Sequence, residues 1–237
     1  MPHNTSQADD PIRAVHADLG RSRLDPKDLE LTAQDVRNNP DQLSRSFRTL
    51  LRNDERLKRV AARSTFHPNG FAKVVLHTGG DCGVRLHVWH WHRQHRAGTL
   101  SPDPHGHRWE FASWIITGAL RETPFDRVTD GEPFVRCEYG RRADGSAYLH
   151  PRRTEMLAPG KPIDRLAGTV YACASSVLHT AEPVGGGLVA SLVFQGRRSR
   201  GATPVYLRPG EPRLQREQTL SVDELRALLA EVAAVVR

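Results

Sequence analysis

Six short apolar or alternating segments between residues 71 and 194 restrict what this chain can fold into. They are FAKVVL (71–76), VRLHVWHW (84–91), EFASWII (110–116), AYL (147–149), TVYACA (169–174) and LVASLVF (188–194). Turn residues separate them, at Gly79-Gly80, Asp130-Gly131, Asp144-Gly145, Pro159-Gly160 and Gly185-Gly186-Gly187. Because no helical pattern stands between these segments, the strands are expected to pair with antiparallel neighbours. The sequence therefore predicts a mainly β protein, built as an antiparallel sandwich or barrel.

Helical patterns flank this β region. Asn39-Pro40 supplies a cap and a first-turn proline, and an apolar stripe follows it, made of Leu43, Phe47, Leu50 and Leu51. We expect Thr32 to cap a shorter helix before it. At the other end, Ser221 and Glu224 form a capping box for a last helix. The predicted organisation is a poorly ordered tail at 1–24, a helical extension at 25–66 that packs on the barrel, the barrel at 67–210 and a C-terminal helix at 211–237.

Composition excludes several classes of protein. The 237 residues carry a net charge of +7, but the arginines are scattered, so we expect no nucleic-acid partner. No apolar stretch approaches the roughly 20 residues of a membrane span, and the N-terminus lacks a secretory pattern. The cysteines are few and widely spaced, at Cys82, Cys137 and Cys173, which argues against a disulfide framework. We expect a cytoplasmic protein that does not associate with membranes, and no residue predicts its oligomeric state.

Two histidines one residue apart stand just before a predicted strand, at His105 and His107. Alternate residues of a strand share a face and lie about 7 Å apart, so both imidazoles can reach one metal ion. His179, which follows another apolar segment, is the candidate third ligand. Three neutral imidazoles would leave open positions on the ion for a substrate or dioxygen. The alternative is that the pair lies exposed in a loop after Pro104.

For a second group of histidines, the sequence leaves open whether the side chains point into the barrel or to solvent. His87, His90, His92 and His95 surround the alternating pair Trp89 and Trp91. If the tryptophans line the core, most of these histidines face solvent, which is the reading that the pattern favours. The reverse would make them substrate contacts or a second metal site.

Three arginines raise a similar question. Arg85, Arg121 and Arg136 are expected to be surface charges, although an inward arginine in a barrel would bind an anion.

The histidine pair belongs to a longer motif that resembles the cupin superfamily, a family of small antiparallel β-barrels of jelly-roll type. The motif runs from Gly98 through His105-Gly-His107 and a strand to Gly118, and His179 matches the histidine of the second cupin motif. Most cupins add a glutamate ligand seven residues before the closing glycine, and Phe111 stands there. Glu110 beside it is a reserve ligand, which a one-residue bulge would turn inward.

Within this superfamily, the three-histidine set is similar to cysteine dioxygenase. GALRET (118–123) and VLHTAEP (177–183) resemble segments of that family, and the likeness extends over roughly residues 70 to 200. In FAK (71–73), Lys73 stands where the family has the arginine that holds the substrate carboxylate. The family's Ser-x-His-x-Tyr is replaced by Ser191-Leu-Val193-Phe-Gln195, which implies a less polar pocket and a substrate other than cysteine.

The resemblance implies a non-haem iron(II)-dependent dioxygenase that acts on a small acidic or amino-acid-like molecule. His105, His107 and His179 would hold Fe(II) or another divalent metal. Lys73, Ser191 and Gln195 would line the substrate pocket, and dioxygen would be the second substrate. Two alternatives stay open at this point: a metal-dependent isomerase or lyase that does not use oxygen, and a ligand-binding cupin without enzymatic activity.

Overall fold

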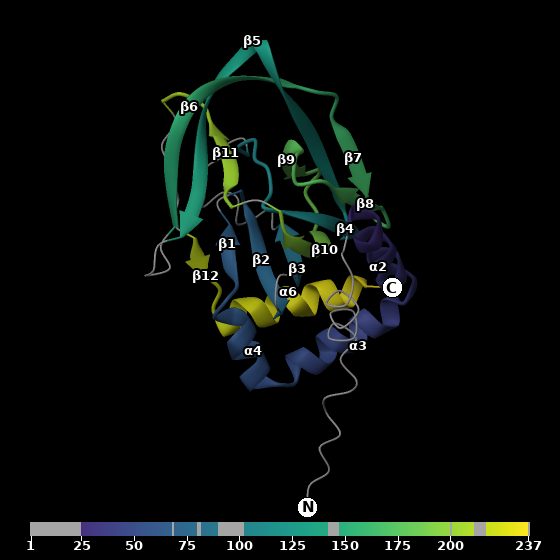
Figure 1. The fold of residues 1–237 in the computed structure, drawn as a ribbon. Coiled ribbons are helices and arrows are strands. Elements are labelled where there is room, and N and C mark those ends of the chain that lie inside the picture. The colour runs from purple at the N-terminus through teal and green to yellow at the C-terminus, as the bar shows by residue number, and fades with distance from the viewer. Residues whose placement is uncertain are drawn as a thin grey trace, which may run out of the picture.

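Two antiparallel sheets form the body of the protein, with helices packed below them (Figure 1). The computed structural model describes residues 25–67, 69–79, 82–89, 102–141, 147–199, 201–210 and 217–236. The predicted tail at 1–24 and the residues His90, Trp91, His92 and His95 lie outside these ranges.

The first sheet, called sheet A here, has seven strands in the order β12-β1-β2-β3-β10-β4-β8. Its strands are β1 Thr65–His67, β2 Phe71–Gly79, β3 Cys82–Trp89, β4 Trp109–Thr117, β8 Val170–Cys173, β10 Val189–Arg198 and β12 Gln218–Thr219. The second sheet, sheet B, is built on the long strand β5, which pairs with every other strand of that sheet. Its strands are β5 Ala119–Arg141, β6 Ala147–Pro159, β7 Ile163–Leu166, β9 Leu178–Pro183 and β11 Thr203–Leu207.

The mainly β, antiparallel fold with N-terminal helices and a C-terminal helix is confirmed. Each of the six predicted segments contributes to a strand: β2, β3, β4, β6, β8 or β10. The arrangement differs from a closed barrel, because sheet B arches over sheet A and no ladder within the described ranges joins the two (Figure 1). A jelly-roll sandwich describes it better.

Four helices cover the outer face of sheet A: α2 Pro26–Asn38, α3 Pro40–Leu51, α4 Asp54–Ala61 and α6 Val222–Val235. The predicted capping box of α6 is confirmed. Helix α3 begins at Pro40 as predicted, but the side chain of Asn39 at its N-cap makes no capping hydrogen bond and donates to the Asp35 carbonyl instead. The prediction for Thr32 is wrong: Asp25 caps α2, and Thr32 lies inside that helix, where its hydroxyl donates to the carbonyl of Asp28. None of the helices in the described part of the chain is both long enough and apolar enough to span a membrane.

Strand alternation gives sheet A two different faces. On β3, Val84, Leu86 and Val88 point outward and join the core shared with the helices. The residues between them, Arg85 and His87, therefore point inward to sheet B, as does Trp89, which packs against Leu120 of β5. On β10, the outward residues are Ala190, Leu192 and Phe194, and the inward ones are Val189, Ser191, Val193 and Gln195. The outer face supplies the core, which leaves the inner face available for polar residues.

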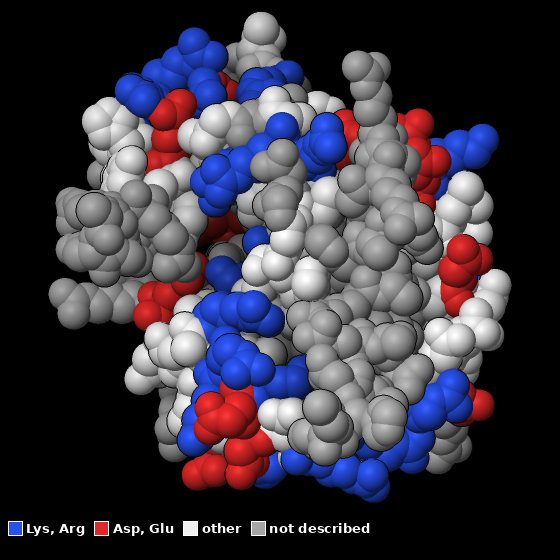
Figure 2. Space-filling view, turned by 60° about the horizontal axis from the view of Figure 1, so that its bottom comes forward, with Lys and Arg blue, Asp and Glu red and all other residues white. Residues whose placement is uncertain are grey.

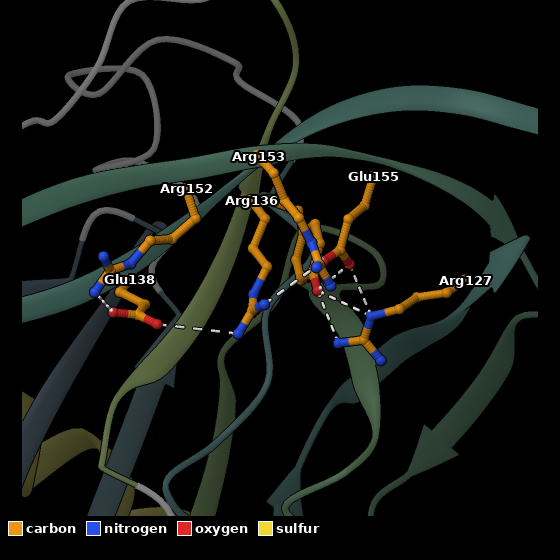
Figure 3. A network of polar contacts seen from close by, with 7 residues as sticks. Arg127, Arg136, Glu138, Arg152, Arg153 and Glu155 are labelled. Atoms are coloured by element: carbon orange, nitrogen blue, oxygen red, sulfur yellow. Dashed lines mark hydrogen bonds and ion pairs between the residues drawn. The ribbon is translucent and has the colours of Figure 1, made fainter.

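A charged network fixes strand β11 to the β5-β6 hairpin (Figure 3). The hydroxyl of buried Tyr206 accepts from Arg127 at 2.8 Å and donates to Glu155 at 3.0 Å. Arg127 and Arg153 each donate to Glu155 at 2.8 Å, and Arg136 lies 3.6 Å from it. Strand β11 in turn holds the segment before β4, because Tyr206 N–H donates to the Pro104 carbonyl at 2.8 Å and Gly106 N–H to the Pro204 carbonyl at 2.9 Å. The network therefore supports the segment that carries His105 and His107.

Charged residues elsewhere are dispersed. On the face drawn in Figure 2, lysines and arginines occur in separate groups among acidic and uncharged residues. Arg121 fits this pattern as predicted, since it is exposed and pairs with Asp164 at 2.8 Å. The absence of a nucleic-acid partner stays a prediction.

Glu155→Gln should make the protein less stable at neutral pH but less sensitive to acid. Burial alone would raise the pKa of Glu155, yet hydrogen bonds from Arg153, Arg127 and Tyr206 lower it from 4.5 to about 2. A carboxylate with a lowered pKa stabilises the fold above its unfolded pKa, and this contribution is lost as the pH falls from 4.5 to about 2. Because the side chains of Arg127 and Arg153 are 48% and 69% exposed, solvent screens their charges. We therefore expect a loss of about 1–2 kcal/mol at pH 7 that shrinks toward zero near pH 2.

Urea unfolding between pH 7 and pH 3 measures this difference. Glu182→Gln, at an exposed position of β9, is the matched control and should follow the wild-type pH dependence. A difference between Glu155→Gln and wild type that stays constant with pH would contradict the prediction.

Candidate metal centre

His105 and His107 lie on one segment and His179 lies on β9, and backbone pairing brings the three side chains together. The backbone of His105 pairs with that of His179 on β9, through two N–H to O=C bonds of 3.0 Å, and forms a second bridge with Val205 on β11. The ring centroids of the three histidines are 5.1–5.2 Å apart. Their ligand atoms all lie within 4.8 Å of one another.

Hydrogen bonds set which nitrogen of each ring is available. The Nδ1 of His105 lies 2.9 Å from the carbonyl of Asp103, and a carbonyl only accepts, so this Nδ1 carries the proton. The Nδ1 of His179 likewise donates to the carboxylate of Glu122 at 2.5 Å. A proton on Nδ1 leaves Nε2 as the nitrogen through which each of these two rings can bind a metal.

The spacing of these donors fits a divalent ion. The Nε2 atoms of His107 and His179 lie 2.9 Å apart. Two imidazoles bound to one ion at about 2.0–2.1 Å would place their nitrogens about 3 Å apart. Burial lowers the pKa of His105 to about 4, with a further contribution from His179, and burial followed by the neighbouring histidines lowers the pKa of His107. These rings are neutral at pH 7, which is the form that binds metal.

Glu122 on β5 is the carboxylate that orients His179. Its side chain is buried and also accepts from Arg165 at 3.1 Å. Burial alone would raise the pKa of Glu122, but the hydrogen bonds and charges of His179 and Arg165 outweigh burial and lower the pKa. Glu122 was given no role by the sequence reasoning, although it lies in the GALRET segment, which was the available signal.

Glu122, His179 and Cys173 form a second close group of potential ligand atoms. Burial and the charge of Glu122 raise the pKa of the Cys173 thiol to about 12, so it stays protonated. A protonated thiol is a poor ligand, and His179 already belongs to the first group. All three cysteines are buried, and none of them forms a disulfide in the described part of the chain.

The side chain of Glu110 does not lie with the three histidines. The ring of Phe111 lies 4.8 Å from that of His107, so Phe111 occupies the inward position of β4. Alternation turns its neighbour Glu110 the other way, and Glu110 is in neither group of ligand atoms. The position at which the resemblance would place a glutamate ligand is therefore occupied by a phenyl ring.

The predicted pocket residues all lie on the inner face of sheet A. Lys73 pairs across the ladder with His87, and His87 with Ser191. Gln195 lies in the row of Gly83 and Phe111. Lys73 is 3.3 Å from Glu217, which also accepts from the Tyr139 hydroxyl at 2.9 Å.

Two residues of β3 face inward against expectation. His87 shares the face of Trp89, two residues along the strand, and its ring packs 4.5 Å from that of Phe71. The pattern favoured an outward direction for most of the four histidines. His87 points inward, and His90, His92 and His95 lie outside the described residues. Arg85 is on the same face and stacks on Trp109, 4.7 Å from its ring centroid, so it is not a surface charge.

Comparisons with known proteins give only distant likenesses. No family model and no curated protein matches the chain. Among solved structures, KdgF from Halomonas sp. overlaps 54% of this chain and 82% of its own, at 12% identity and a TM-score of 0.32. The hydroquinone 1,2-dioxygenase PnpCD, solved with Cd²⁺ and 4-hydroxybenzonitrile, overlaps 60% and 72%, at 13% identity and a TM-score of 0.34. The hydroquinone 1,2-dioxygenase from Sphingomonas sp. TTNP3, solved with 4-hydroxybenzoate, overlaps 61% and 73%, at 9% identity and a TM-score of 0.34. At these scores, none of them indicates what this chain binds.

Gly106→Ala should destabilise the protein, because the glycine lets β11 approach the histidine pair. A Cβ at position 106 would lie 2.9 Å from the Pro204 ring and 3.3 Å from Leu178. The proline ring cannot move aside, so we expect a loss of about 1–3 kcal/mol. Gly186→Ala is the matched control, since a Cβ there meets nothing within 4 Å, and it should be nearly neutral. Urea unfolding measures both variants, and equal stabilities would show that the close approach at Gly106 is not required.

Proposed function

We propose that this protein is a three-histidine, iron(II)-dependent dioxygenase that acts on a small, acidic or amino-acid-like molecule. The observation that carries the proposal is the cluster of His105, His107 and His179, whose ligand atoms lie within 4.8 Å of one another on the inner side of the sandwich. Three neutral nitrogen donors from one cluster suit a divalent transition metal and leave positions on it for other molecules. The cysteine dioxygenase-like motifs around these residues favour iron.

The chain's own residues would perform three tasks around the metal. The carboxylate of Glu122 holds the Nδ1 proton of His179 and so keeps Nε2 available. Phe111, Val193 and Cys173 form an apolar cluster beside the histidines, which restricts water on that side. Lys73, Ser191 and Gln195 present an ammonium, a hydroxyl and an amide from the inner face of sheet A, where a polar substrate can be oriented. Bound iron(II) would supply the electron density that dioxygen needs for reaction.

Metal analysis and oxygen uptake test the proposal together. The freshly purified protein should contain about one iron per chain, and it should consume oxygen with at least one member of a panel of small carboxylic acids, amino acids and thiols. His107→Ala removes one of three ligands and should abolish both metal retention and oxygen uptake. An exposed histidine provides the control, His150→Ala on β6, which should behave as wild type.

Three results would contradict the proposal in different ways. Stoichiometric zinc without iron, or oxygen uptake that is unchanged in His107→Ala, would remove the oxygenase. Turnover that persists under strict anaerobiosis would indicate an isomerase or lyase that uses the metal as a Lewis acid. A ligand retained through purification, without turnover on any metal, would indicate a binding protein.

Glu122→Gln should weaken metal binding without removing a ligand. The amide cannot accept from His179 Nδ1 as strongly as the carboxylate, and loss of such an orienting partner typically costs about 10–100-fold in metal affinity. Competition with a chromogenic chelator measures the affinity, and Glu182→Gln is the control. An unchanged affinity would show that the His179–Glu122 bond only supports the fold.

A further inference from the structure

The outer face of sheet B carries a group of charges that the proposed metal site does not use. On β9, Leu178 packs with Phe134 and Tyr206, whereas the next residue, His179, points into the sandwich with the other two histidines. Successive residues of a strand point to opposite faces, so Tyr206 lies on the outer face. Arg136 is directly opposite Tyr206 in the β5-β11 ladder and shares that face. The charges around Arg136 therefore lie on the other side of the sheet from the histidine cluster.

These charges include more guanidinium groups than carboxylates (Figure 3). Ion pairs of 4.0 Å or less connect four arginines and two glutamates into one group, here called the arginine cluster. Its members are Arg127, Arg136, Arg152, Arg153, Glu138 and Glu155. Four positive and two negative charges leave a net charge of +2 within the cluster. A molecule that brought two negative charges would neutralise it.

The pairing of β5 with β6 concentrates the positive charge. Arg136 lies directly opposite Arg153, and a like-charged pair in that position destabilises a sheet. The register shifts by one residue immediately after this pair, so that Arg152 is an extra residue of β6. Such a bulge redirects a side chain, and here it brings Arg152 to Glu138, on the face that Arg136 occupies. Three guanidinium groups are thereby collected on one face.

Arg136, between the two glutamates, keeps hydrogen-bond donors that these carboxylates do not use. Its guanidinium lies 3.6 Å from Glu155 and 4.0 Å from Glu138, and both distances are longer than a hydrogen bond. Its Nε is buried and has no hydrogen-bond partner among the residues that the structure describes. A buried donor without a partner is uncommon in native proteins and is typical of a site that water or an ion completes.

We propose that Arg136, Arg152 and Arg153 form a binding site for the phosphate group of a small molecule. Near neutral pH a phosphate group carries close to two negative charges, which match the excess charge of the cluster, whereas a carboxylate carries one. Its oxygens accept the parallel N–H donors of guanidinium groups. The two glutamates interrupt the positive charge, so the cluster fits one phosphate group better than an extended polyanion. The site is independent of the proposed metal.

Isothermal titration calorimetry at constant ionic strength tests the site with inorganic phosphate and with glycerol 3-phosphate. Wild-type protein should bind about one phosphate per chain saturably, and tighter binding of the ester would identify an organic phosphate rather than the free ion as the ligand. Arg136→Gln and Arg152→Gln should each weaken binding at least about tenfold, because each removes a charge-assisted contact with the phosphate oxygens.

Glu138→Gln should have the opposite effect. It removes a negative charge beside the site and releases Arg152, so we expect phosphate to bind at least about threefold more tightly. A folding defect cannot increase the affinity, so this variant tests the site even where an arginine variant fails to fold.

Arg121→Gln is the matched control, since it lowers the net charge by the same amount at an exposed position of β5. It should bind phosphate as wild type does. The inference would be overturned by a wild-type protein without saturable phosphate binding, or by affinities that change in neither Arg136→Gln nor Glu138→Gln. An equal loss in Arg121→Gln would reveal a general effect of net charge and would overturn it too. Tighter binding of a single-stranded oligonucleotide than of either phosphate would instead indicate a surface for polyanions.

Discussion

The fold and the candidate site both depend on the short backbone pairing of His105 with two strands at once. His105 exchanges two hydrogen bonds with His179 on β9, and its neighbours accept from and donate to β11. This pairing inserts the His-x-His segment into sheet B, so that its imidazoles meet the ring of a residue 72 positions away in sequence. Gly106 is required between them because Pro204 and Leu178 occupy the space that a side chain would need. The hydrogen bonds of Tyr206 with Arg127 and Glu155 contribute indirectly, because they fix the strand against which the segment pairs.

The two faces of sheet A have different roles: the outer face supplies the core, and the inner face carries the polar residues of the candidate site. Leu86 and Leu192 on the outer face join the helical core, where burial of apolar surface stabilises the fold. The inner face can then carry Arg85, His87 and Ser191, each of which would be costly to bury in an ordinary core. This division depends on the register of the strands, because a shift of one residue in β3 would place Leu86 on the inner face and turn Arg85 and His87 outward. The site is therefore tied to the register of the sheet.

Sequence patterns predicted the part of this structure that rests on apolar periodicity. The strands with apolar runs and helix α3 were predicted because burial makes apolar residues recur at every second position in a strand and at about every fourth position in a helix. Strand β5 and most of β6 were missed, because charged residues such as Arg127, Glu132 and Arg153 interrupt the apolar pattern that the few buried residues of these strands would leave. The three histidines were found because their spacing and motifs are local. The inward direction of His87 and Arg85 was not predicted. Strand alternation fixes which residues share a face of the sheet, but it does not show which face points toward the other sheet.

The charges around the histidine cluster bear on both the metal and the acidic substrate of the proposed function. A divalent ion held by three neutral imidazoles would keep its full charge, whereas a glutamate at the position of Phe111 would have removed part of it. The carboxylate of Glu122 contacts the cluster through His179 and also accepts from Arg165. Arg85 adds a further positive charge on the facing wall. Such a balance of charges would suit the acidic substrate of the proposed function, because a neutral phenyl ring at Phe111 would leave the charge of a bound ion available to an anion.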